Sequence, residues 1–226
     1  MVDYTFVVEK ICPICYEKTR VVKTRSRLVV EKRDEDLCVH YKNFNPYYYK
    51  IWICENCGFA AEEKTFTSAL PKKQREAIWN FLHSKNFDIE FSETRTFPDA
   101  VASYQLAIAY QDLINGSPCR RATLNLNLAW MYRFNDDHEK EREYMLKAAE
   151  FYDRSLSTER YPVDGMSDGS VLYVIGAIYY RLGLLDKCTQ YLSRIISDQD
   201  LRSREPRVYD KARDLWGDVR ASKKSR

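Results

Sequence analysis

The sequence is poor in glycine and histidine, and it has little excess charge of either sign. It holds only seven glycines and three histidines, with no glycine-rich phosphate loop and no G-x-S-x-G motif. Its 36 basic and 33 acidic residues give a net charge of +3. No run approaches the roughly 18 apolar residues of a membrane span, and residues 1–6 lack the basic start of a signal peptide. We therefore expect a soluble cytoplasmic protein that makes no use of the common enzyme motifs.

Charge is also evenly divided along the chain. Up to Phe66 there are 11 basic and 10 acidic residues, so the basic excess of a dedicated nucleic-acid binder is missing. One local exception is the segment of residues 18–27, which contains five basic residues and no acidic one: Lys18, Arg20, Lys23, Arg25 and Arg27. A nucleic-acid contact is one interpretation of this basic stretch, and a solvated strand edge guarded by lysine and arginine is the other.

Four of the seven cysteines form two closely spaced pairs. Cys12 and Cys15 enclose Pro13-Ile14, Cys54 and Cys57 enclose Glu55-Asn56, and 38 residues separate the pairs. A C-x-x-C turn points two thiolates at one ion, and two such turns complete the tetrahedral sulfur shell that zinc prefers in structural sites. The spacing predicts one structural Zn²⁺. Four sulfur ligands leave no open position for an activated water, which disfavours hydrolytic chemistry and an enzyme.

The connector between the pairs contains further potential ligands. Cys38 and His40 could join the metal shell or lie beside it; alternatively, Cys38 is a small buried residue and His40 a packing or surface residue. Asp34 and Asp36 could suggest a carboxylate site, although an acidic turn between strands also explains them. Cys119 and Cys188 fall on apolar helical positions and are expected to be core thiols.

The hydrophobic pattern differs between the two parts of the chain, so we expect an α+β protein. β-branched and aromatic residues predict strands at residues 4–11, 20–30 and 48–53, which form a small β zinc-ribbon-like domain over residues 1–66. Residues 86–96 are polar and irregular, and the tail 221–226 is expected to fray. Helical spacing predicts an all-α domain over residues 67–226, with helices at 72–85, 98–114, 118–134, 138–156, 169–182, 185–197 and 206–221.

The helical part resembles tetratricopeptide (TPR) repeats. Leu172-x2-Ile175-Gly176-x2-Tyr179 and Leu128-Ala129-x2-Tyr132 match the first-helix pattern of such a repeat. By motif position, a partner-binding groove would then be lined by Trp130, Arg133, Phe134, Tyr173, Tyr180 and Arg181. Aromatic stacking and arginine–carboxylate contacts would hold a protein or peptide there. The alternative is that this face packs against the N-terminal domain or another subunit.

The chain as a whole resembles an uncharacterised bacterial family that joins a four-cysteine zinc-ribbon-like segment to TPR-like helices. The residues that carry the resemblance are Cys12-Pro13-x-Cys15, Asp34-x-Asp36-x-Cys38, Tyr41-Lys42-x2-Asn45-Pro46-x2-Tyr49 and Cys54-x2-Cys57-Gly58-x-Ala60-Ala61. The resemblance implies this architecture and supplies no activity. Our expectation is a zinc-binding adaptor or scaffold for protein–protein interaction. The rival interpretations are a nucleic-acid-associated zinc-ribbon protein and a thiol-based redox sensor that releases zinc on oxidation.

Overall fold

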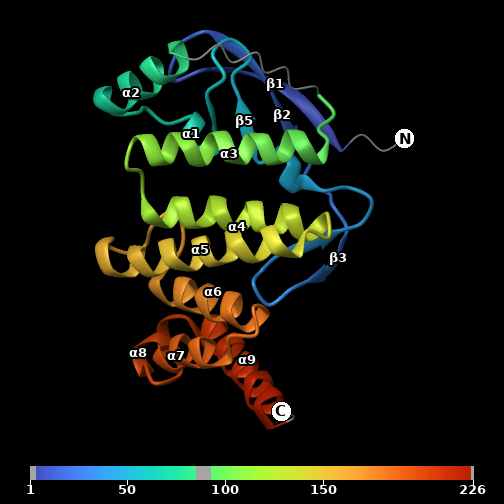
Figure 1. Cartoon of the computed structure of the whole chain (residues 1–226), viewed down its shortest axis with the longest axis vertical. Helices are drawn as coiled ribbons and strands as arrows, with labels where there is room; N and C mark the ends of the chain where they lie inside the picture. The colour runs from blue at the N-terminus through green and yellow to red at the C-terminus, as the bar shows by residue number, and fades with distance from the viewer. Residues whose placement is uncertain (1–3, 85–92, 225–226) are drawn as a thin grey trace.

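The computed structural model describes residues 4–84 and 93–224, and it has the predicted α+β architecture (Figure 1). Six short strands form three antiparallel pairs in the N-terminal part. They are β1 (Thr5–Ile11) with β2 (Lys18–Thr24), β3 (Val30–Arg33) with β4 (Val39–Tyr41), and β5 (Ile51–Ile53) with β6 (Ala60–Glu62). The turn of the first pair holds Cys12 and Cys15, and the turn of the third holds Cys54 and Cys57.

Two of the predicted strands differ from the observed ones. The strand expected at residues 48–53 starts as a 3-10 helix, η1 (Pro46–Tyr49), and only Ile51–Ile53 is extended. Asn45 explains the difference, because its side chain accepts a hydrogen bond from Tyr47 N and caps the turn that Pro46 begins. The strand expected at 20–30 is divided between β2 and β3.

Each predicted helix is present, with bounds shifted by a few residues at most. They are α2 (Lys72–His83), α3 (Phe97–Leu113), α4 (Pro118–Phe134), α5 (His138–Thr158), α6 (Asp168–Arg181), α7 (Leu185–Ile196) and α9 (Pro206–Lys224). Two short helices, α1 (Glu63–Phe66) and α8 (Gln199–Arg204), were not predicted. The expectation of a frayed tail from residue 221 is wrong as far as Lys224, because α9 continues to that residue. Most of the irregular segment expected at 86–96 lies outside the described residues.

Side-chain caps fix where several helices begin. Ser117 accepts a hydrogen bond from Arg120 N and Pro118 follows at the first helical position. Thr96 and Asp99 form a reciprocal capping box at the start of α3. These local signals explain why the predicted helix starts were accurate.

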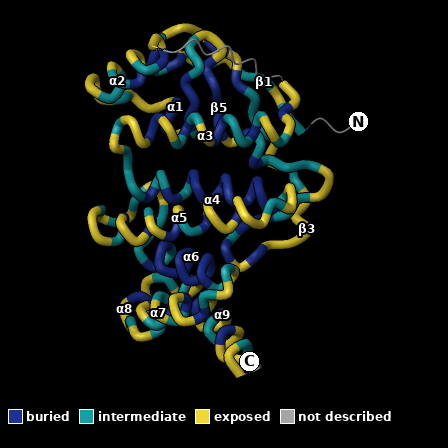
Figure 2. The backbone as a smooth tube through the Cα atoms, in the orientation of Figure 1, coloured by how far each residue is buried: buried dark blue, intermediate teal, exposed yellow. Residues whose placement is uncertain are grey.

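The elements are stacked in layers along the longest axis of the molecule (Figure 1). The first and third strand pairs and α2 lie at one end, and α3 lies against them. The layers α4–α5, α6–α7 and α9 follow in order, and β3 lies beside α4 and α5. Buried backbone runs through the centres of these layers (Figure 2), and one connected hydrophobic core extends from Cys12 to Val219. Among the described residues no helix is long and apolar enough to cross a membrane. The division into domains at residue 66 stays a prediction, since the core crosses it.

Candidate metal centre

Two similar turns bring the four cysteines together. In the first turn, Tyr16 N donates a hydrogen bond to Cys12 O; in the second, Gly58 N donates to Cys54 O. The residue after each pair has left-handed backbone, with φ of 63° at Tyr16 and 77° at Gly58. Glycine adopts this conformation at no steric cost, whereas tyrosine is strained there. The two C-x-x-C motifs therefore fold into matching turns, or knuckles, at the ends of two β-hairpins.

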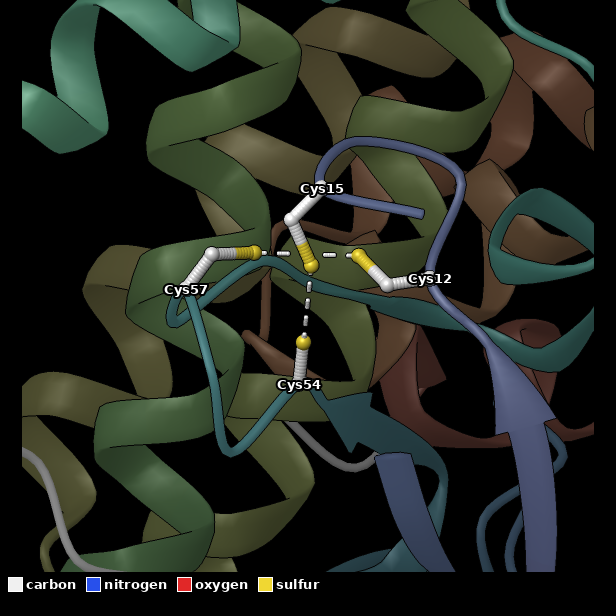
Figure 3. A group of neighbouring side chains, drawn as sticks. All are labelled: Cys12, Cys15, Cys54 and Cys57. Atoms are coloured by element: carbon white, nitrogen blue, oxygen red, sulfur yellow. Dashed lines mark hydrogen bonds between the residues drawn. The ribbon is translucent and has the colours of Figure 1, made fainter. Parts of the chain in front are cut away.

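The sulfur atoms of the two knuckles face one another (Figure 3). Cys12 Sγ lies 3.7 Å from Cys57 Sγ, and Cys15 Sγ lies 3.7 Å from Cys54 Sγ. All four sulfurs lie within 4.8 Å of one another. A zinc–sulfur bond of about 2.3 Å in tetrahedral geometry places neighbouring sulfurs roughly 3.8 Å apart. The donor set and its spacing therefore fit one tetrahedral Zn²⁺ with no further rearrangement.

Contacts between the two hairpins hold the second knuckle against the first. Glu55 N donates to Thr19 Oγ1 at 3.0 Å, and Asn56 Nδ2 donates to the carbonyl oxygen of Lys18 at 2.8 Å. From the helical side, Tyr110 of α3 donates its hydroxyl to Gly58 O at 2.9 Å. The four-cysteine cluster is thus attached to the first layer of helices as well as to its own strands.

The protonation of these thiols depends strongly on their neighbours. Hydrogen bonds from Cys12 and then from Cys57 lower the pKa of Cys54 to about 2. The hydrogen bond with Cys54 is the largest effect that raises the pKa of Cys12, to about 12. The hydrogen bond with Cys12 is the largest effect that raises the pKa of Cys57. Without metal, these hydrogen bonds thus favour a thiolate at Cys54 and protonated thiols at Cys12 and Cys57. Binding Zn²⁺ requires thiolates, so metal uptake releases protons.

The connector between the knuckles is docked on the far side of α3, against α4 and α5. Arg133 of α4 donates to Asp34 Oδ2 at 2.9 Å, to Asp36 Oδ1 at 3.0 Å and to Glu141 Oε1 at 2.8 Å. These side chains are almost fully buried, with 5% of Arg133 and 0% of Asp36 exposed. Trp130 donates its indole N–H to Asp36 Oδ2 at 3.0 Å. We call this group of residues the acidic clamp.

A second group of potential metal ligands belongs to the acidic clamp. Asp34, Cys38 and His40 have donor atoms within 4.8 Å of one another. Asp34, however, already accepts hydrogen bonds from His40 at 2.7 Å and from Arg133, and it pairs with Lys32 at 3.0 Å. Burial alone would raise the pKa of Asp34, but its hydrogen bonds with His40 and Lys32 and the charge of Arg133 lower that pKa to about 2. Burial raises the pKa of Cys38 above its usual value. A buried thiol beside a guanidinium is poorly suited to bind a cation.

Cys38 and His40 thus form a group with Asp34 that is separate from the four cysteines. Cys38 is fully buried in the core, and His40 packs edge-on against Phe134 with ring centres 5.2 Å apart. Cys119 and Cys188 are fully buried as well, in agreement with the expectation of core thiols.

The predicted groove residues lie close together, but the connector occupies much of that face. Trp130 and Arg133 bind the acidic clamp, and Tyr173 donates its hydroxyl to the carbonyl oxygen of Glu35 at 3.0 Å. Phe134 packs on Tyr47, while Tyr180 is partly buried and Arg181 pairs with Glu141 at 2.5 Å. The sequence left open whether this face binds a partner or packs against the N-terminal segment. For Trp130, Arg133 and Tyr173 the structure shows the packing.

Three side chains of the basic stretch at residues 18–27 make contacts within the chain. Lys23 pairs with Glu63 at 2.7 Å, Arg20 pairs with Glu93, and Arg25 lies over the ring of Phe6. These contacts reduce the positive field available to a phosphate backbone. They favour the interpretation of a guarded strand edge.

Sequence reasoning missed the role of Asp34 and Asp36 as partners of Arg133. The available signal was the pair of acidic residues at alternate positions together with an arginine inside an apolar helix. A buried arginine requires carboxylate partners, but the residues that supply them are almost 100 positions away in the chain.

The fold and this site define a class: an α+β protein in which a four-cysteine centre joins two β-hairpins next to a helical array. A family model described as "Uncharacterized protein conserved in bacteria (DUF2225)" matches residues 7–219, and the chain belongs to this family. No curated protein and no solved structure matches the chain.

Proposed function

We propose that the protein is a zinc-binding adaptor, in which Cys12, Cys15, Cys54 and Cys57 hold one structural Zn²⁺. The observation that carries the proposal is the sulfur cluster, because its 3.7 Å spacings fit a closed tetrahedral shell. A closed shell serves folding and leaves no position for a substrate or an activated water. The zinc therefore shapes a surface, and the function lies in what that surface contacts.

Large apolar side chains gather beside the metal centre. Ile11 and Tyr16 flank the first cysteine pair and are 64% and 60% exposed, while Trp79 of α2 is 39% exposed. Arg75 connects Tyr16 and Trp79, since it donates to the Tyr16 hydroxyl and lies one helical turn before Trp79. We call Ile11, Tyr16, Arg75 and Trp79 the knuckle surface. Exposed aromatic residues with an arginine are typical of protein-binding hot spots, so we place the partner site there.

Metal analysis tests the first half of the proposal. The purified protein should contain one zinc per chain, and Cys54→Ser should lower the zinc content and destabilise the N-terminal strands. Cys188→Ser is the matched control, because Cys188 is buried far from the cluster and should leave the zinc content unchanged. Zinc-free wild-type protein with intact secondary structure and an unchanged melting temperature would contradict the structural-zinc assignment.

Site-specific crosslinking in the source cells tests the second half. A photoreactive phenylalanine analogue at position 16 or 79 should give discrete protein adducts, and the same analogue at the exposed position 147 should not. Adducts at 16 and 79 should disappear in the Cys54→Ser background, since the knuckle no longer forms. Equal adduct patterns at all three positions, or none above background, would contradict an adaptor role for this surface.

A further inference from the structure

A large cavity lies between the β-hairpins and α4. Its volume is about 810 Å³, which is within the range of about 300–1,000 Å³ for small-molecule sites. Its lining comes from β2, the β3–β5 region, the start of α1, α4 and the loop after α5. Junctions between two structural parts are common places for ligand sites.

One wall of the cavity is aromatic and the rest carries paired charges. The aromatic residues are Tyr41, Tyr47, Tyr49 and Trp52. Three of the basic lining residues have carboxylate partners: Lys23 pairs with Glu63 at 2.7 Å, Lys64 with Asp164 at 2.9 Å, and Arg120 with Asp164 at 3.0 Å. The charges within these pairs neutralise one another, so these residues offer little charge to a ligand.

Lys50 and Glu62 are different, because both line the cavity and, among the described residues, neither makes a direct ion pair. Lys50 donates to Asn127 Oδ1 at 3.2 Å and stands 4.7 Å from the ring centre of Tyr47. No carboxylate of the described residues lies within 4.0 Å of its ammonium, and the carboxylate of Glu62 has no hydrogen bond there. The cavity thus holds an ammonium and a carboxylate that are not joined by a direct ion pair.

Loss of surrounding water shifts the pKa values of both groups toward their neutral forms. Lys50 is an exposed residue overall, yet the protein around its ammonium removes water and lowers its pKa, an effect that the charge of Glu62 opposes. Burial likewise raises the pKa of Glu62, although the charge of Lys50 opposes the effect. Lys50 directly precedes β5, and Glu62 pairs with Ile51 at the end of β6, so the two backbones are adjacent.

We propose that this cavity binds a small zwitterion of amino-acid or dipeptide size. The ligand carboxylate is held by Lys50, the ligand ammonium is held by Glu62, and the apolar body lies against Tyr47, Tyr49 and Trp52. A simple anion would satisfy Lys50 and leave Glu62 unpaired, and a simple cation would do the reverse. A zwitterion is the class of ligand that satisfies both charges at once.

Isothermal titration of the zinc-loaded full chain tests this proposal with matched probes. The zwitterions are L-phenylalanine and L-alanyl-L-phenylalanine; the N-acetyl forms lack the ammonium and the C-terminal amides lack the carboxylate. At least one zwitterion should bind, and each blocked form should bind at least about tenfold more weakly, because a charge-assisted hydrogen bond is lost. No heat from either zwitterion at 10 mM would overturn the proposal.

Variants assign the two ends of the ligand. Lys50→Met should weaken the zwitterion at least about tenfold and leave the C-terminal amide unaffected, whereas Glu62→Gln should weaken the zwitterion and leave the N-acetyl form unaffected. Lys147→Met, on the exposed face of α5, is the control. Circular dichroism and zinc content show whether each variant is folded. An N-acetyl form that binds as tightly as the zwitterion would define an anion site and overturn the assignment of Glu62.

Discussion

Replacing Arg133 with methionine removes the centre of the acidic clamp while it keeps a side chain of similar length. Asp34 would retain His40 and Lys32, and Glu141 would retain Arg181. Asp36 is the residue most affected, since it is fully buried and would keep only the Trp130 indole and the Cys38 backbone N–H. Breaking a buried pair by removing one partner costs about 3–5 kcal/mol. Against a typical total stability of about 5–15 kcal/mol, this is a large loss.

Urea denaturation of the zinc-loaded protein at pH 7, followed by circular dichroism, measures this loss. A double-mutant cycle with Arg133→Met and Asp36→Asn separates the pair from its surroundings. The double variant should lose at least about 1 kcal/mol less than the sum of the single variants, because the neutral asparagine no longer requires a cation. Arg213→Met, on the exposed face of α9, should change the free energy of unfolding by less than about 0.5 kcal/mol.

Two results would refute this reasoning. A loss below about 1 kcal/mol in Arg133→Met would mean that the buried carboxylates tolerate the absence of the guanidinium. Additive losses in the double variant would mean that Arg133 stabilises the fold through packing and not through Asp36.

Three further predictions concern the metal centre and pH. Gly58→Ala should destabilise the protein by about 1 kcal/mol, since φ is 77° there and the added methyl group would lie no closer than 3.8 Å to Leu82; an unchanged urea midpoint would contradict this. Asp34 has a folded pKa of about 2 against its usual 3.8, so its stabilisation is complete above about pH 4 and is lost as pH falls toward 2. Asp34→Asn should therefore cost about 1–2 kcal/mol at pH 7 and far less at pH 2, as measured by urea titration at both pH values. Zinc affinity, measured by competition with a chelator, should fall as pH is lowered because the cysteines must lose protons, and a pH-independent affinity would contradict thiolate ligation.

The sequence was most informative where local signals act. C-x-x-C spacing predicted which four cysteines gather, and caps such as Ser117-Pro118 placed the starts of helices within a residue or two. Of the two left-handed residues that follow the cysteine pairs, the sequence predicted only one. Gly58 suggested its own conformation, but Tyr16 adopts it against its steric preference.

The sequence was least informative where contacts join distant segments. Arg133 fell at a groove position of the repeat pattern, and nothing in that pattern shows that the acidic connector covers it. Asp34 and Asp36 looked like an ordinary turn between strands because their partner is on α4. The cavity beside Lys50 was also unforeseen, since it depends on how the hairpins sit on the helices.

The acidic clamp also has a consequence for the entropy of metal binding. Between Cys15 and Cys54 the chain has 38 residues, and the docking of Asp34 and Asp36 divides this loop into segments of 18 and 17 residues. Halving a flexible loop reduces its closure cost by about 0.6 kcal/mol, which is roughly a threefold gain in affinity. The salt bridges of Arg133 would therefore tighten the proposed zinc site without contacting it, because they shorten the free chain that the metal must close.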